Sequence, residues 1–231
     1  MNYIFLDTET TGVDETATVC EVAFAITDEA FNILSQHQSI IDPEQMISPA
    51  ASGVHGLTWD DCKDFPTLGE YFSADDPSCY GSPLPDPAVV IGHRCGFDMR
   101  FISKHFRQTP RQIDTLRWVR KLYPDMDNHQ LSTCIFALNL PRSAGAHRAM
   151  ADVMSAYYLC QHVCERTGYT LEQLAQASEQ PMELAYYPFG KHKGTPFSQV
   201  PKHYLGWALR ELKDLDVDML YTLRLHLKQE K

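Results

Sequence analysis

The stretch Tyr3-Ile-Phe-Leu-Asp7-Thr-Glu9-Thr-Thr-Gly12 decides the fold of this chain. Tyr3–Leu6 is almost wholly apolar, which predicts a short central strand buried on both faces. Asp7 and Glu9 follow two residues apart at the carboxyl end of this strand, so their side chains leave it on the same side. Because unpaired carboxylates at a buried strand end are costly, we expect a cation beside them.

The segments around this strand predict an α/β fold with a mixed sheet flanked by helices. Further strands are expected where apolar and β-branched residues alternate or run together, at 18–26, 31–41 and 89–91. Apolar residues with helical spacing follow at 97–105, 116–122, 131–138 and 149–163. Gly168 is expected to end the last and longest of these helices.

Three parts are expected along the chain. They are a main domain, a helical linker and a small C-terminal α+β module, at residues 1–167, 168–180 and 181–231. The module is expected to combine a hairpin at 186–193 with amphipathic helices at 204–212 and 219–227. Within the main domain, the four prolines of residues 73–87 predict an exposed loop.

Composition favours a globular protein without a membrane segment. The chain has 231 residues, 44% of them hydrophobic, which is enough to bury a sizeable core. No apolar run approaches the roughly 20 residues that cross a bilayer, and acids stand where a signal peptide needs a basic region. The seven cysteines are odd in number and include no Cys-x-x-Cys pair, so reduced core thiols are expected. We therefore expect a cytoplasmic protein with no membrane partner.

Charge is divided unevenly along the chain, whose net charge is −10. Residues 1–93 carry sixteen acids and one base, whereas residues 94–148 carry ten bases and four acids. A basic stretch can bind the phosphates of a nucleic acid, although the solvated faces of helices commonly look the same. Both interpretations stay open for Arg94, Arg100, Lys104, Arg107, Arg111, Arg117, Arg120 and Lys121.

Three further polar residues stand where chemistry is expected. Asp98 follows the strand at 89–91, where it could join the carboxylate pair or cap the next helix. His147 and Asp152 are five residues apart, about 500° of helical rotation, so they do not share one helix face. We therefore expect His147 on the loop before the helix, where it could act as a general base beside Asp152. Taken singly, His147 could also be an ordinary polar residue.

Together these residues resemble a known family. Asp7-Thr-Glu9-Thr-Thr-Gly, His93-x-x-x-Phe97-Asp98 and His147-x-x-x-x-Asp152 are similar, in order and spacing, to the three motifs of the DEDDh (DnaQ-like) exonucleases. The resemblance spans residues 1 to about 165, and segments 54–58 and 113–116 look like accessory motifs of the same family. Segments 189–194 and 204–207 are similar to the C-terminal region of the exodeoxyribonuclease X branch of that family.

The resemblance implies a ribonuclease-H-like fold and hydrolysis of the 3′-terminal phosphodiester with two divalent cations. Asp7 would bridge the two ions. Glu9 and Asp152 would complete one metal site, Asp98 would serve the other, and His147 would deprotonate the attacking water. All-oxygen ligation favours Mg²⁺ or Mn²⁺ over zinc. The residues implied to contact the terminal nucleotide or its phosphate are Thr8, Thr10, Thr11, His55, Leu57, His93 and Arg94.

Two positions beside the motifs distinguish this chain. Members of the family commonly have Asn where this chain has Arg94, and the arginine could hold a phosphate or slow the enzyme. A related class has a catalytic Tyr four residues before the last Asp, where Arg148 stands here. His147 is therefore the expected base.

The expected function is a 3′-to-5′ exodeoxyribonuclease that releases 5′-mononucleotides from single-stranded or duplex DNA 3′ ends in DNA repair. The alternative enzymes are an RNA 3′-trimming exonuclease and a polymerase proofreading subunit of the same fold. The alternative from another class is a non-catalytic nucleic-acid-binding adaptor, against which the five intact catalytic positions speak. Near the C-terminus, Lys191, Lys193 and Lys202 alternate with aromatic residues and could contact single strands or be ordinary surface.

Overall fold

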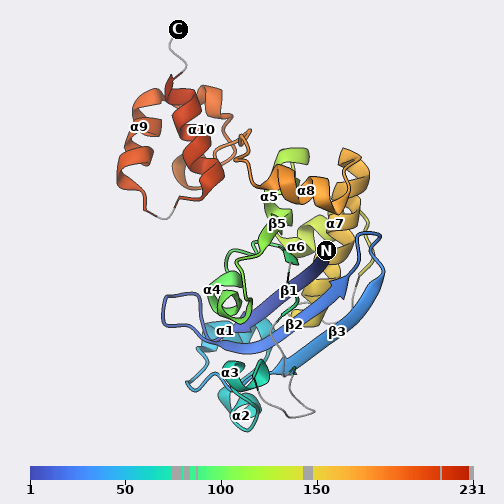
Figure 1. Ribbon diagram of the computed structural model, residues 1–231. Helices are drawn as coiled ribbons and strands as arrows, with labels where there is room; N and C mark the ends of the chain where they lie inside the picture. The colour runs from blue at the N-terminus through green and yellow to red at the C-terminus, as the bar shows by residue number, and fades with distance from the viewer. Residues whose placement is uncertain (74–79, 81–83, 87, 143–147, 214, 229–231) are drawn as a thin grey trace.

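The computed structural model describes residues 1–73, 80, 84–86, 88–142, 148–213 and 215–228. These residues form a five-stranded mixed sheet with helices packed against it, and a separate pair of helices near the C-terminus (Figure 1). The predicted fold class is confirmed. Most of the loop expected at 73–87 lies outside the described residues. No helix in the described part is long and apolar enough to cross a bilayer.

The central strand β1 is the N-terminal stretch that opens the sequence. It spans Asn2–Thr10, and Tyr3–Leu6 is at most 1% exposed, as expected for a strand covered on both faces. β1 pairs antiparallel with β2, with Asp7 opposite Ala23, and parallel with β4. The order in the sheet is β3-β2-β1-β4-β5, and the other strands are β2 Val19–Thr27, β3 Ile33–Ile40, β4 Ala88–Gly92 and β5 Arg111–Asp114.

Two hydrophobic cores cover the two faces of this sheet, because successive side chains of a strand point to opposite sides. Phe5 and Ile91 pack into the core under the helices α5 to α8, whereas Leu6 and Val90 pack on the other face under α3 and α4. The longest helix, α7, packs across β1, β2 and β4. The helices of this domain are α1 Pro49–His55, α2 Trp59–Cys62, α3 Leu68–Tyr71, α4 Met99–Ile102, α5 Thr115–Leu122, α6 Leu131–Ala137, α7 Ala149–Thr167 and α8 Leu171–Ser178.

The segment expected to link the two parts of the chain belongs to the first of these cores. Helix α8 forms within 168–180 as predicted, and its Leu171 and Leu174 are fully buried among the residues that cover β1. Arg111 of β5 donates to both carboxylate oxygens of Glu172, at 2.8 and 2.7 Å. The segment therefore packs into the main domain as well as connecting it to the module.

The C-terminal residues form a module with its own small core. The two predicted helices are present as α9 (Lys202–Glu211) and α10 (Val217–Lys228), and they pack on each other around a buried cluster. The expected hairpin is reduced to one antiparallel bridge between Tyr186 and Pro196, and the described residues contain no strand here. Pro188 and Pro196 lack the amide hydrogens that a longer ladder would need.

A buried ion pair fixes this module to the main domain. Arg117 of α5 reaches Asp218 of α10 through Nε and Nη2, each at 2.7 Å, and Asp218 is 2% exposed. Arg117 also donates to the carbonyl oxygens of Ser178 and Gln180. The amide of Met182 donates to Asp218 Oδ1. Because this pair is extensively hydrogen-bonded, it holds the two parts in one orientation.

Candidate active site

Three carboxylates meet at the carboxyl end of β1. Asp7 and Glu9 lie on β1, and Asp152 lies in the first turn of α7, where the helix dipole favours negative charge. One carboxylate oxygen from each residue lies within 4.8 Å of those from the other two. The structure thus brings together three of the acids that the sequence singles out.

Asp98 is a buried fourth acid at the same site. It is 4% exposed and directly precedes α4. Its Oδ1 accepts hydrogen bonds from the amide of Thr8 at 2.9 Å and from Thr8 Oγ1 at 2.6 Å. The side chain makes no capping bond to α4. The carboxylate is therefore held against β1 at Thr8, the residue between Asp7 and Glu9 in sequence, and the alternative that it caps the helix is not what the structure shows.

Burial raises the pKa values of the acids at this site, and for Asp7 and Glu9 the neighbouring carboxylates raise them further. Burial, followed by the charges of Asp98 and Asp152, holds the pKa of Asp7 well above its usual range. Burial and then the charges of Asp152 and Glu21 raise the pKa of Glu9 to about 7. Burial raises the pKa of Asp98 to about 7, although hydrogen bonds, chiefly those from Thr8, oppose the shift. At neutral pH such a cluster requires a cation to hold all of its charge.

An ion pair that the motifs do not reveal, with its acid buried and its base partly exposed, lies beside the cluster. Glu21 of β2 is fully buried and is the register partner of Glu9. Arg148 donates to both of its oxygens, through Nη2 at 2.7 Å and Nε at 3.1 Å, and the amide of Ala149 donates to Oε2 at 3.2 Å. Because Ala149 begins α7, this pair fixes the helix that carries Asp152. The sequence signal for it is a single charge in a strand that is otherwise almost wholly apolar.

His147, the expected general base, lies outside the described residues. Helix α7 begins at Ala149, and Arg148 before it has an extended backbone with φ −128° and ψ 129°. The role of His147 as a base therefore stays a prediction.

The residues expected to receive the terminal nucleotide are mostly buried. Thr8, Thr10, Thr11, His55 and Leu57 are each 5% to 8% exposed. His55 Nε2 bonds to the carbonyl oxygen of Thr10 at 3.2 Å, and its Nδ1 accepts the amide of Leu57 at 3.1 Å. Burial lowers the pKa of His55, so the ring is neutral at pH 7. Its two bonds tie Leu57 to the end of β1.

Both ring nitrogens of His93 are also hydrogen-bonded within the protein. Its Nε2 lies 2.7 Å from the carbonyl oxygen of His129, and its Nδ1 lies 3.0 Å from Thr115 Oγ1. Burial lowers the pKa of His93 to about 4, so the ring is neutral, with Nε2–H donating and Nδ1 accepting. The side chain therefore joins the end of β4 to the segment before α6.

Comparison with known proteins agrees with this geometry. The family model RNase_T, described as Exonuclease, matches residues 4–160. The chain belongs to this exonuclease family. It is 24% identical over 229 residues to exodeoxyribonuclease 10 of Escherichia coli (strain K12), covering 96% of this chain and 97% of that protein. It is 31% identical over 164 residues to DNA polymerase III PolC-type of Bacillus cereus, covering 68% of this chain and 11% of the polymerase.

Solved structures share the fold of this exonuclease. Exonuclease X in complex with 5′ overhanging duplex DNA superposes with a TM-score of 0.56 at 25% identity, covering 76% of this chain and 97% of that chain. The complex of E. coli exonuclease I with single-stranded DNA gives 0.61 at 19% identity, covering 76% of this chain and 42% of that chain. The predicted family and the predicted enzyme class, a 3′-to-5′ exonuclease, are confirmed.

The exonuclease site has the ligands for a divalent cation, on which enzymes of this family depend. Asp7, Glu9 and Asp152 offer only oxygen ligands, which hard divalent cations prefer, and these oxygens lie close enough to share one ion. Burial and then repulsion among the carboxylates raise the pKa values of Asp7 and Glu9, and a bound cation would favour their charged forms against both effects. Asp7, Glu9 and Asp152 are therefore suited to binding a divalent cation.

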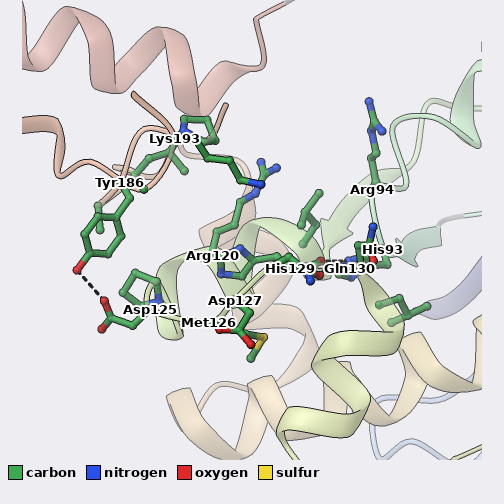
Figure 2. A pocket seen from close by; sticks show the side chains of 18 of the residues that line it. His93, Arg94, Arg120, Asp125, Met126, Asp127, His129, Gln130, Tyr186 and Lys193 are labelled. Carbon is green, nitrogen blue, oxygen red and sulfur yellow. Dashed lines mark hydrogen bonds between the residues drawn. The ribbon is translucent and has the colours of Figure 1, made fainter. Parts of the chain in front are cut away.

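A cleft of about 1000 Å³ opens from the exonuclease site. It is lined by Asp7 and Asp152, by the segment 124–132, and by residues 184–188 and 193–194 of the C-terminal module. In Figure 2, His93 and Arg94 lie on one side of the cleft, and Tyr186 and Lys193 lie on the opposite side. Both parts of the chain thus bound the cleft.

Arg94 stands in a backbone conformation that suits Asn better. Its φ is +71°, in the left-handed region, and its amide donates to Asp114 Oδ1 at 2.8 Å. The side chain is exposed and lines the cleft with Asp7. A residue other than Gly, Asn or Asp costs roughly 1 kcal/mol in this region. The arginine therefore adds a cation to the cleft at a cost in stability.

We expect Arg94→Asn to raise the free energy of unfolding by about 0.5–1 kcal/mol and to raise KM for a nucleic-acid substrate. Urea denaturation measures the first effect and exonuclease kinetics the second. Arg94→Lys is the control, because it keeps the charge and the backbone strain. Equal stability of the Asn and Arg forms would contradict the strain, and an unchanged KM would contradict the substrate contact.

Proposed function

We propose that this exonuclease hydrolyses DNA from the 3′ end and releases 5′-mononucleotides with the help of two Mg²⁺ or Mn²⁺ ions. The observation that carries the proposal is the convergence of Asp7, Glu9 and Asp152, with Asp98 hydrogen-bonded to Thr8 beside them. DNA as the substrate is supported by the similarity to exodeoxyribonuclease 10 along nearly the whole chain and by the likeness to exonuclease X, solved with DNA. A place in DNA repair belongs to the same proposal.

The acids have separate roles in this proposal. Asp7 would serve both ions, Glu9 and Asp152 would hold one of them, and Asp98 would serve the other. When bound, the ions supply Lewis-acid stabilisation of the attacking and leaving oxygens. Thr8 fixes the carboxylate of Asp98 against β1 through its two hydrogen bonds to Oδ1.

Digestion of labelled nucleic acids tests the proposal. The purified chain is incubated with 5′-labelled single-stranded DNA, duplex DNA and RNA of one sequence, with Mg²⁺, with Mn²⁺ and with EDTA. We expect a ladder of products shortened from the 3′ end of DNA, free 5′-mononucleotides, and no reaction in EDTA. Faster digestion of RNA than of DNA would favour the RNA-trimming alternative. Binding of DNA without any hydrolysis would favour the adaptor.

His147→Ala should lower kcat by about 10²- to 10⁴-fold, the usual contribution of a general base, while metal affinity changes little. Single-turnover kinetics measure the first quantity and calorimetric titration with Mn²⁺ the second. Loss of Mn²⁺ binding would indicate that His147 is a metal ligand. Unchanged turnover would show that His147 is not the general base.

A further inference from the structure

We propose that the C-terminal module binds the DNA strand under digestion, with Lys193 contacting a backbone phosphate on the 5′ side of the scissile bond. This inference rests on the proposed function, because it requires a DNA strand with its 3′ end at the acidic cluster. It goes beyond that function by giving a binding role to a part of the chain that carries none of the catalytic acids.

The first argument is the extent of the cleft. Its volume of about 1000 Å³ is at the upper end of the range of roughly 300–1000 Å³ that sites for whole small molecules occupy. Asp7 and Asp152 line it together with Tyr186 and Lys193, which come from the other part of the chain. The cleft therefore has room for more than one nucleotide and continues from the acids to the module.

The second argument is charge. Lys193 is exposed in the cleft wall, and no carboxylate of the described residues pairs with it. Arg120 lines the same cleft and reaches only a distant oxygen of Asp216, at 3.5 Å. Both side chains extend into the same part of the cleft (Figure 2). In a chain of net charge −10, two cations that extend into the same part of the cleft from different parts of the chain indicate an anion-binding site, and a phosphodiester backbone is the anion that a nuclease cleft receives.

The third argument is that Lys193 has a fixed position relative to the acids. Its amide donates to the carbonyl oxygen of Gly190 at 3.1 Å, and the amide of Gly194 donates to that of Tyr187 at 2.9 Å, so the backbone of this loop is held at both residues. Tyr186 Oη donates to Asp125 of the main domain at 2.6 Å, and the ion pair between Arg117 and Asp218 is a second link between the module and that domain. A cation on a rigid support binds with less loss of entropy than one on a mobile tail.

The structure also separates the three lysines that the sequence groups together. Lys193 lines the cleft, whereas Lys191 and Lys202 do not. Lys191 is exposed on the same turn, two residues away. It therefore provides a control of the same residue type and the same local structure.

The test compares a long substrate with a short one in the full-length chain. The long substrate is a single-stranded dodecathymidylate, and the short one is the p-nitrophenyl ester of thymidine 5′-monophosphate, which offers no phosphate beyond the scissile one. For Lys193→Ala we expect the ratio of kcat/KM, long over short, to fall about fivefold, with a larger fall for Lys193→Glu. The ratio for Lys191→Ala should equal that of the parent chain. The plot of log binding constant against log salt concentration for the long substrate should become less steep by about 0.7 in Lys193→Ala, the contribution of one phosphate contact on a single strand.

Circular dichroism and thermal unfolding establish that each variant is folded, and Lys193→Gln replaces any variant that is not. Equal ratios for the Lys193 and Lys191 variants, or an unchanged salt slope, would overturn the inference while leaving the proposed function intact. A parent chain that hydrolyses neither substrate would overturn both.

Discussion

An Asp7→Asn variant should lose exonuclease activity by at least about a thousandfold and yet unfold at a higher temperature than the parent chain in metal-free buffer at pH 8. The loss of activity follows because Asp7 stands at the centre of the acidic cluster and is the carboxylate we assign to both ions. The gain in stability follows because the same position places one negative charge among others. Asn has nearly the same shape and removes that charge.

The shifted pKa values determine how the stability of the metal-free parent chain changes with pH. Glu9, with an ordinary value of 4.5, and Asp98, with an ordinary value of 3.8, both titrate at about 7 in the folded chain, and Asp7 is raised as well. An acid whose pKa is raised on folding holds its proton more tightly in the folded state. Its contribution to stability is therefore complete below about pH 4 and is lost as the pH rises through about 7. The metal-free parent should thus be least stable at alkaline pH.

Thermal unfolding at pH 5 and pH 8, with and without Mn²⁺, measures these effects. In the parent chain Mn²⁺ should raise the unfolding temperature more at pH 8 than at pH 5, and Asp7→Asn should respond little to the ion. Glu15→Gln is the matched control, because it removes an acid at an exposed position outside the cluster. A metal-free Asp7→Asn that unfolds below the parent at pH 8 would contradict the assigned repulsion.

The parts of the fold that were predictable from sequence are those that local patterns determine. Tyr3–Leu6 was predictable as a buried strand because both of its faces are apolar. The helix Ala149–Thr167 was predictable because apolar residues recur at helical spacing and Gly168 follows, and in the structure Gly168 ends the helix in the left-handed conformation. Strand β5 has no such pattern, because only Ile113 among its four residues is buried. Its place at the sheet edge comes from pairing with β4, which local sequence does not encode.

The acids of the site were predictable because they follow strand ends and helix starts, whereas their supporting contacts were not. His93 bonds to His129 and Thr115, which lie 36 and 22 residues away. A histidine in a motif gives no sign of whether its ring nitrogens face substrate or protein, since only the folded chain supplies the partners. The same holds for Glu21, whose partner Arg148 is 127 residues distant.

Arg148→Met should lower the free energy of unfolding by about 3 kcal/mol at pH 8, the lower end of the cost of breaking a buried ion pair, because Arg148 itself is partly exposed. Burial alone would raise the pKa of Glu21, but hydrogen bonds from Arg148, Gln38 and the amide of Ala149 together lower it. Without the arginine, burial dominates and that pKa rises.

The loss of stability should therefore depend on pH. In the parent chain the lowered pKa of Glu21 stabilises the fold above about pH 4.5 and loses this contribution as the pH falls. In Arg148→Met the sign reverses, because a raised pKa stabilises at acid pH and the benefit is lost as the pH rises. The difference between the two chains should thus be small near pH 4 and largest at pH 8, as urea denaturation across this range would measure.

The double variant Glu21→Gln/Arg148→Met distinguishes the cost of an unpaired buried charge from the loss of the hydrogen bonds that the pair makes. Gln keeps an oxygen that can accept the amide of Ala149, so the double variant should regain most of the stability at pH 8. Arg166→Met, at the exposed far end of the same helix, is the control and should change stability little. If the double variant were as unstable as Arg148→Met alone, an unpaired buried Glu21 would not be the cause. Recovery of stability together with activity would show that an uncharged oxygen at position 21, bonded to the amide of Ala149, is enough to anchor the first turn of α7 and with it Asp152.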